Sequence, residues 1–108
     1  MYSPAPPQFS DKVEYYEGIR DLQEVFNEAE ASTGNDRKEF LEKFGDKVRL
    51  EPLYKQTQKQ LRALRQKKKS IEKMQSDPAR AYDQIQRIEA QMDLLFDRFN
   101  KRYREANK

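Results

Sequence analysis

The sequence contains no cysteine and no histidine, and these two absences exclude the most common kinds of catalytic and metal-binding site. Without cysteine there is no disulfide framework, no thiolate ligand and no thiol nucleophile. Without histidine the chain lacks the usual general base and the most common ligand of transition metals. We therefore expect no catalytic residues, no metal site and no bound cofactor, and we predict that the protein is not an enzyme.

Glycine is also scarce, and the three glycines Gly18, Gly34 and Gly45 stand far apart. A phosphate-binding loop of the nucleotide-binding type needs closely spaced glycines, so none is expected. No apolar run approaches the roughly 18–20 residues that a membrane span needs. The N-terminus lacks the basic region and apolar stretch of a signal peptide, which argues against secretion by that route.

Strand-forming residues are few, because Val, Ile and Thr together occupy nine of the 108 positions. Ala, Leu, Glu, Lys, Arg and Gln, which favour helices, occupy 59. Apolar residues make up 35% of the chain and charged residues 38%. This balance suits elongated helices with a narrow buried seam better than a compact globule. The composition predicts an all-α fold.

The sequence divides into a short lead and a single helical domain. The prolines Pro4, Pro6 and Pro7 predict a flexible, extended lead over residues 1–8. One helical domain is expected over residues 9–108. Apolar periodicity and capping residues predict helices over residues 10–33, 36–44, 51–75 and 78–105. Whether the chain is a piece of a longer polypeptide, as such a lead suggests, stays open.

The first helix is expected to begin at Ser10 and to bury one face. Its apolar positions recur every three or four residues, at Val13, Tyr16, Ile19, Leu22, Phe26 and Ala29. Gly34 is expected to adopt a left-handed conformation after this helix, and Gly45 is expected to end the short helix that follows.

The two long helices are expected to form an antiparallel, coiled-coil-like hairpin. One seam runs through Leu50, Tyr54, Thr57, Leu61, Leu64, Lys68 and Ile71. The other runs through Ile85, Ile88, Met92, Leu95, Phe99 and Arg102. The short break near Asp77 permits only an antiparallel connection, and it pairs Lys68 with Ile88 across the seam. The N-terminal helix and the short helix are expected to pack on this hairpin.

Charge is unevenly distributed along the chain. Residues 1–46 contain 5 basic and 11 acidic residues, whereas residues 47–108 contain 17 basic and 8 acidic residues. One interpretation is intramolecular, with an acidic first helix lying along a basic hairpin. The other is a basic surface that binds nucleic acid or another anion.

Five basic residues recur on the side of the third helix that faces away from its seam. This basic stripe consists of Lys55, Lys59, Arg62, Lys69 and Lys73. It spans about 27 Å at the helical rise per residue, which is long enough to follow several phosphates. The stripe is therefore a candidate phosphate-binding surface, although the solvated flank of a coiled coil has the same pattern.

Three apolar or aromatic residues, Phe9, Tyr15 and Leu94, lie off the main seams. An exposed apolar patch beside charged residues is typical of a protein-docking surface, so these three are candidate docking residues. The alternative is that the short helix, through Phe40, Leu41 and Phe44, covers this face and closes a bundle. We expect a protein partner or a neighbouring domain of a parent chain, and an oligomer is not excluded.

Five short segments occur in a characteristic order: S-D-K-V-E-Y-Y-E, E-F-L-E-K-F, R-L-E-P-L-Y, L-R-A-L-R-Q-K-K-K-S-I-E and F-D-R-F-N-K-R-Y. Over residues 10–103 the chain resembles a helical module of the large polyvalent protein-associated domains. Those domains occur in very long polypeptides of bacteriophages and related mobile elements.

The resemblance implies a non-enzymatic interaction or structural module of a phage virion-associated protein, one that is ejected with the DNA. It implies a location in the virion or in the cytoplasm of the bacterial host. Two other functions stay open, namely a helical protein that binds nucleic-acid backbones and a small phage inhibitor of a host protein.

Overall fold

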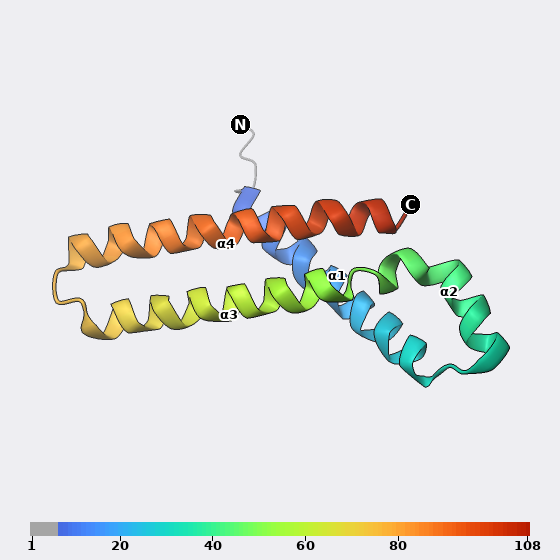
Figure 1. Ribbon diagram of the computed structural model, residues 1–108. Coiled ribbons are helices and arrows are strands. Elements are labelled where there is room, and N and C mark those ends of the chain that lie inside the picture. The colour runs from blue at the N-terminus through green and yellow to red at the C-terminus, as the bar shows by residue number, and fades with distance from the viewer. Residues whose placement is uncertain (1–6) are drawn as a thin grey trace, which may run out of the picture.

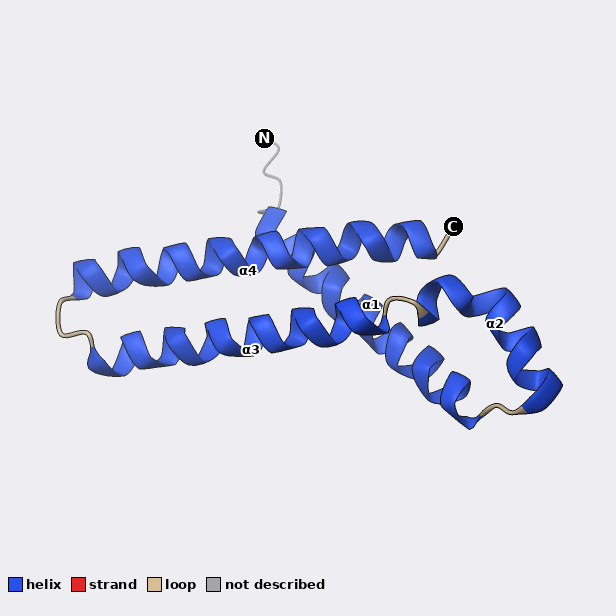
Figure 2. Cartoon of the chain, in the orientation of Figure 1, coloured by secondary structure: helices blue, strands red, loops and turns tan. Residues whose placement is uncertain are grey.

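The computed structural model describes the backbone of residues 7–108 and the side chains from residue 11 onward. Helices are the sole regular elements in that range: α1 (Pro7–Ala31), α2 (Gly34–Val48), α3 (Glu51–Met74) and α4 (Pro78–Ala106) (Figure 2). The predicted all-α fold is thus confirmed. The molecule is elongated and thin, with extents of 60 × 40 × 15 Å.

The two long helices, α3 and α4, run antiparallel and form the predicted hairpin (Figure 1). Asp77, in the short connection between α3 and α4, caps the start of α4. The Asp77 carboxylate accepts hydrogen bonds from the backbone N–H groups of Ala79 at 3.0 Å and Arg80 at 3.5 Å. These bonds satisfy donors that the first turn of a helix leaves free, so α4 begins sharply at Pro78.

The pairing across the hairpin agrees with the predicted register. Lys68 contacts Glu89 at 3.0 Å, one residue from its predicted partner Ile88. Near the connection, Gln75 donates a hydrogen bond to Gln84 at 3.5 Å. Lys68 is a charged residue within an apolar seam, and Glu89 neutralises it there.

Helix α1 crosses behind the hairpin in Figure 1, and α2 returns from its end to the start of α3. The core forms at this crossing, because side chains of α1 pack between the first half of α3 and the second half of α4. The buried cluster consists of Tyr15, Ile19, Leu22, Leu50, Tyr54, Leu61, Phe96 and Phe99. The Tyr15 ring lies at the centre, with its centroid 5.0 Å from that of Phe96 and 5.2 Å from that of Phe99.

The predicted face of α1 was wrong in its first turns. Val13 and Tyr16 are partly exposed, whereas Tyr15 is 1% exposed. Steps of three residues fall short of a full helical turn, so a series of such steps drifts around the helix. Tyr15 and Leu22 are seven residues apart, close to two full turns, and therefore share a face. The 4-3-4-3 spacing from Tyr15 through Ala29 was the signal that could have identified the true face.

Two helix boundaries differ from the predictions by three or more residues, and the others agree within two residues. Helix α1 begins at Pro7 rather than Ser10, since proline is well tolerated in a first helical turn. Helix α2 continues through Gly45 to Val48. Gly45 has no positive φ angle, and a glycine in ordinary helical conformation weakens a helix without ending it. Gly34 has a φ of 60°, as predicted.

These contacts divide the molecule into two regions. We call residues 11–61 together with residues 92–106 the base, where α1 and α2 lie against the hairpin. We call residues 66–91 the arm, which contains the distal half of the hairpin and extends beyond α1 and α2. Arg65 marks the boundary, where its side chain donates a hydrogen bond to the hydroxyl of Tyr16.

Candidate interaction surfaces

The basic stripe of α3 is exposed along its whole length. Each of its five side chains is solvent-exposed: Lys55, Lys59, Arg62, Lys69 and Lys73. Among the described side chains, no carboxylate lies within ion-pair distance of any of them. Five like charges on one helix face repel one another unless an anion is bound, so the stripe is available to an external anion.

The acidic residues of α1 pair with basic residues of the base instead. The Arg104 guanidinium donates two hydrogen bonds to the Glu14 carboxylate in a bidentate ion pair, with N···O distances of 2.6 and 2.5 Å. Asp21 accepts hydrogen bonds from Lys47 at 2.9 Å and from the Tyr103 hydroxyl at 2.5 Å. The intramolecular interpretation of the charge asymmetry therefore holds at the base, and these pairs leave the stripe uncompensated.

The environment of Asp21 has a defined effect on its ionisation. Partial burial acts to raise the pKa of Asp21, but the hydrogen bonds from Tyr103 and Lys47 and the charge of Lys47 outweigh burial and lower it. Burial and the Asp21 carboxylate both raise the pKa of Tyr103. The Tyr103 hydroxyl therefore stays protonated and acts as a donor that ties α4 to α1.

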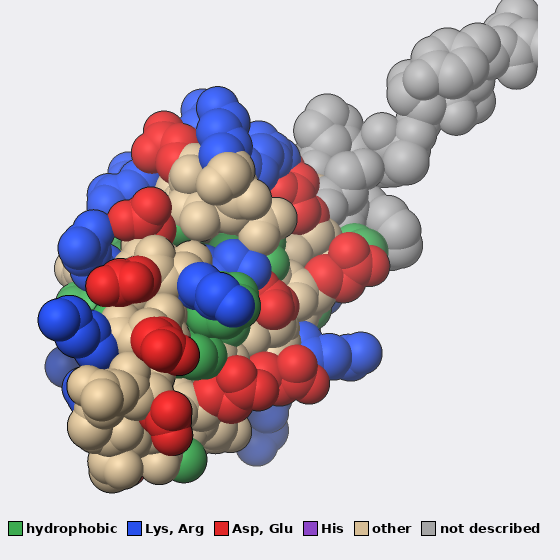
Figure 3. Space-filling view, turned by 90° about the vertical axis from the view of Figure 1, so that its right-hand side faces the viewer, with side chains coloured by type: hydrophobic (Ala, Val, Ile, Leu, Met, Phe, Trp, Pro, Cys, Tyr) green, Lys and Arg blue, Asp and Glu red, His purple; other side chains and the backbone are tan. Residues whose placement is uncertain are grey.

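The end-on view from the α2 side shows how charge is segregated (Figure 3). Lys and Arg side chains gather along the left and upper edges, and the left edge is the front of Figure 1. Asp and Glu side chains spread across the middle of this view. The left edge therefore carries more basic side chains than the middle of this end of the molecule.

The three candidate docking residues have different outcomes. Tyr15 is 1% exposed and sits in the aromatic core, so its assignment to a docking surface was wrong. Leu94 is 65% exposed on the outer side of α4. The side chain of Phe9 lies outside the described residues. Helix α2 packs mainly against α1, so it does not close the bundle over Leu94.

A shallow groove that was not predicted runs along the arm between α3 and α4. It consists of two adjoining hollows that share Lys67, Ile71 and Gln84. We call it the arm groove, and its other lining residues are Ser70, Met74, Gln75, Arg87, Ile88 and Gln91. Ile71 and Ile88 belong to the seams and form an apolar floor, while Lys67 and Arg87 stand on opposite rims.

The arm groove lies on the face of the hairpin opposite α1. Phe96 and Asn100 of α4 contact α1. Arg87 and Gln91, which line the groove, precede Phe96 and Asn100 by nine residues each. Nine residues make two and a half helical turns, so the two pairs lie on opposite faces of α4. The one signal for the groove in the sequence is the set of uncharged glutamines beside the seams, which do not cover the apolar residues.

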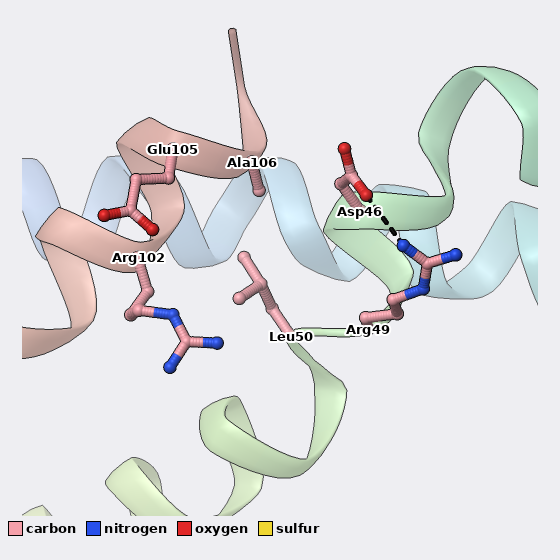
Figure 4. A pocket seen from close by; sticks show the side chains of 6 residues that line it. All are labelled: Asp46, Arg49, Leu50, Arg102, Glu105 and Ala106. Carbon is pink, nitrogen blue, oxygen red and sulfur yellow. Dashed lines mark hydrogen bonds and ion pairs between the residues drawn. The ribbon is translucent and has the colours of Figure 1, made fainter.

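A second hollow lies at the base, where the end of α4 meets the connection between α2 and α3 (Figure 4). Leu50 and Ala106 lie at its centre, and Arg102 and Glu105 line it from α4. On the other side Asp46 and Arg49 form an ion pair of 2.9 Å. The Asp46 carboxylate is thus satisfied by a neighbour, and a hydroxyl or thiol nucleophile is lacking among these lining residues.

Two further findings apply to the described part of the chain. No helix in it is both long and apolar enough to cross a membrane. No group of three acidic side chains in it is arranged to hold a metal ion.

Comparison of the chain with protein-family models, with curated proteins and with solved structures found no match. The resemblance to the polyvalent protein-associated domains therefore stays a prediction that rests on the quoted segments.

Proposed function

We propose that the protein is a non-enzymatic interaction module in which the base maintains the fold and the arm and basic stripe bind an acidic partner. The observation that carries this proposal is the exposed stripe of five cations without a carboxylate of the described residues in range. The ion pairs among the described residues use other cations, such as Lys47, Lys101 and Arg104. Unpaired like charges on one helix lower stability slightly, which is a reason to expect a bound anion to offset them.

An acidic protein is the partner that we favour. The arm combines cations with an apolar groove and with the exposed apolar side chains of Met74 and Tyr82. Protein interfaces combine an apolar centre with a charged rim, whereas a phosphate backbone needs only the cations.

A nucleic-acid backbone is the second candidate, and the length of the stripe favours it. From Lys55 to Lys73 the stripe follows about 27 Å of helix, which matches several phosphates of a duplex. Binding of this kind is sequence-independent and falls steeply as the salt concentration rises.

The biological setting that we propose follows the resemblance of residues 10–103. It places the module in a long phage polypeptide that is carried in the virion and ejected with the DNA into the bacterial cytoplasm. A small inhibitor of a host protein is the alternative. Peptides of this chain in purified virions are the expected finding, and their absence from virions of a phage that expresses it contradicts the setting.

The binding function is tested with two charge-reversal variants of the full chain. The stripe variant carries Lys59→Glu, Arg62→Glu and Lys69→Glu. The control variant carries the same number of reversals at exposed positions of α1 and α2: Arg20→Glu, Lys38→Glu and Lys43→Glu. Both variants therefore have the same net charge.

Fluorescence anisotropy measures the affinity of each protein for polyglutamate and for a short DNA duplex at low salt. We expect the stripe variant to lose binding at least tenfold while the control variant keeps it. Preference for polyglutamate supports a protein partner, and preference for the duplex, with a slope of log K against log salt near −0.9 per phosphate contact, supports the second candidate. Equal losses in the two variants, or no binding to either probe by the unmodified chain, contradict the proposal.

A further inference from the structure

We infer that the arm groove is a docking site for an acidic amphipathic helix of a partner protein, which binds as a third helix against α3 and α4. The inference rests on the proposed interaction function and names the partner class. Its starting point is the shape of the groove. From Lys67 to Gln75 the groove follows about 12 Å of α3, which corresponds to about two helical turns.

The apolar floor supplies the first requirement for such a partner. Ile88 is buried and Ile71 half-buried, and the side chain of Met74 stands 83% exposed at the distal end. A helix that lays leucine-like side chains on this floor excludes water from Ile71 and Met74. Methionine is flexible and adapts to the shape of an incoming side chain.

The charge of the rims supplies the second requirement. Lys67 projects from α3 and Arg87 from α4, and both are exposed. None of the nine residues that line the groove is acidic. Acidic side chains on both flanks of a docked helix complement the two rims, whereas basic flanks are repelled.

The chain itself provides a precedent on the opposite side of the hairpin. There α1 occupies the groove between α3 and α4 at the base, with Tyr15 against Phe96 and Phe99. Glu14 on its flank contacts Arg104 of α4 at 2.5 Å. An apolar ridge with acidic flanks is thus what this pair of helices already binds.

Other occupants fit the arm groove less well. A second copy of the chain offers α1 as its acidic amphipathic helix, and the apolar face of α1 is already buried in its own base. Helix α2 carries equal numbers of acidic and basic residues. A nucleic-acid backbone has no apolar side to cover Ile71 and Ile88.

The probe is a fluorescent 15-residue peptide that has leucine at heptad seam positions and glutamate at the flanks. Two control peptides accompany it, one with the same composition in scrambled order and one with lysine in place of glutamate. Since two turns cover less area than a standard interface, we expect the full chain to bind the probe with a Kd of about 10–100 µM. Both control peptides should bind at least tenfold more weakly.

Two variants locate the site on the protein. The groove variant carries Lys67→Glu and Arg87→Glu, and its matched control carries Arg20→Glu and Arg80→Glu, which are exposed on α1 and α4 and belong neither to the groove nor to the basic stripe. We expect the groove variant to weaken binding at least tenfold and the control to weaken it less than twofold. Met74→Glu, at a position with little role in folding, should weaken binding several-fold.

Several outcomes overturn the inference. They are equal binding of the scrambled peptide, equal losses in the groove and control variants, and absence of binding at 1 mM protein. In an NMR titration with the probe, changes of amide chemical shift confined to α1 and α2 also contradict it. Sedimentation that reveals a dimer joined through the arm assigns the groove to a second copy instead. The proposed function stands or falls separately, because its test uses the stripe variant, which leaves Lys67 and Arg87 intact.

Discussion

The base and the arm are built from the same two long helices, yet they differ in how completely they bury their seams. In the base, α1 covers the hairpin, and Leu61, Phe96 and Phe99 are at most 2% exposed. In the arm, Ile88 is the one fully buried seam residue, and Ile71 is half-buried. Two helices can enclose only one narrow strip between them, so a third helix is needed to close a core.

The polar contacts follow the same division. In the base, buried Asn100 donates a hydrogen bond to the backbone carbonyl of Asp11 at 2.9 Å, and Gln23 donates one to the Tyr54 hydroxyl at 2.9 Å. In the arm the main polar contact is the partly exposed pair of Lys68 and Glu89. The contact of the buried Asn100 helps to fix the position of α1, whereas the partly exposed ion pair contributes little to stability. The arm is therefore the region that can change partners at the lowest cost.

The largest expected effect compares two seam residues of α3. Leu61→Ala should lower the free energy of unfolding by about 3 kcal/mol, because it opens a cavity in the closed core of the base. Ile71→Ala in the arm should cost about 1 kcal/mol, because water already reaches this side chain. Urea unfolding followed by circular dichroism measures both. Equal losses mean that the arm is as well packed as the base, which breaks the comparison.

The next effect concerns the buried polar contacts. Asn100→Leu keeps the number and branching of the side-chain heavy atoms but removes the donor from α4 to the carbonyl of Asp11, so we expect a loss of about 1–2 kcal/mol. Gln75→Ala, which removes the long contact to Gln84 in the arm, should change stability by less than about 0.5 kcal/mol. Thermal and urea denaturation test the pair, and a neutral Asn100→Leu shows that the contact does not hold α1 in place.

A smaller effect on stability is expected from the two glycines of α2, a helix of the base that has no buried residue. Gly45→Ala should stabilise the protein by about 0.5–1 kcal/mol, since Gly45 is helical and its added methyl group meets nothing within 4 Å. Gly34→Ala should destabilise it by about 1 kcal/mol, because Gly34 has a φ of 60°. The two melting temperatures must move in opposite directions; a shift of the same sign refutes the assignment of α2.

The smallest effect is the dependence on pH. Because the folded pKa of Asp21 is lowered, its contribution is present above the unfolded value near 4 and is lost as the pH falls below it. Burial and the nearby carboxylates of Asp11 and Glu89 raise the pKa of Asp93, partly offset by Lys12, so Asp93 destabilises the fold as the pH rises through its folded value.

At pH 7 Asp21→Asn should therefore lower stability and Asp93→Asn should raise it, each by less than about 1 kcal/mol because both groups are partly exposed. At pH 3 the difference between each variant and the unmodified chain should shrink. Unfolding curves at the two pH values provide the measurement, and effects of equal sign at pH 7 contradict the charge environments described for these carboxylates.

The sequence by itself determined the local features of this protein. The helices, the cap at Asp77, the left-handed Gly34 and the pairing of Lys68 near Ile88 were all predicted correctly. Each depends on residues within one or two turns, or on the fixed register that a short connection imposes on two helices. The exposed position of the basic stripe followed in the same way, because residues opposite a seam face solvent when two helices pair.

Only the tertiary structure decided which surfaces are covered. Tyr15 and Tyr16 are adjacent, and the crossing angle and position of α1 determine which ring enters the core. The same crossing leaves Leu94 exposed and opens the arm groove on the far side of the hairpin. Periodicity specifies which side of a helix is apolar, but it does not specify where along a long hairpin a third helix lies. That position depends on the sum of many side-chain contacts between residues far apart in sequence.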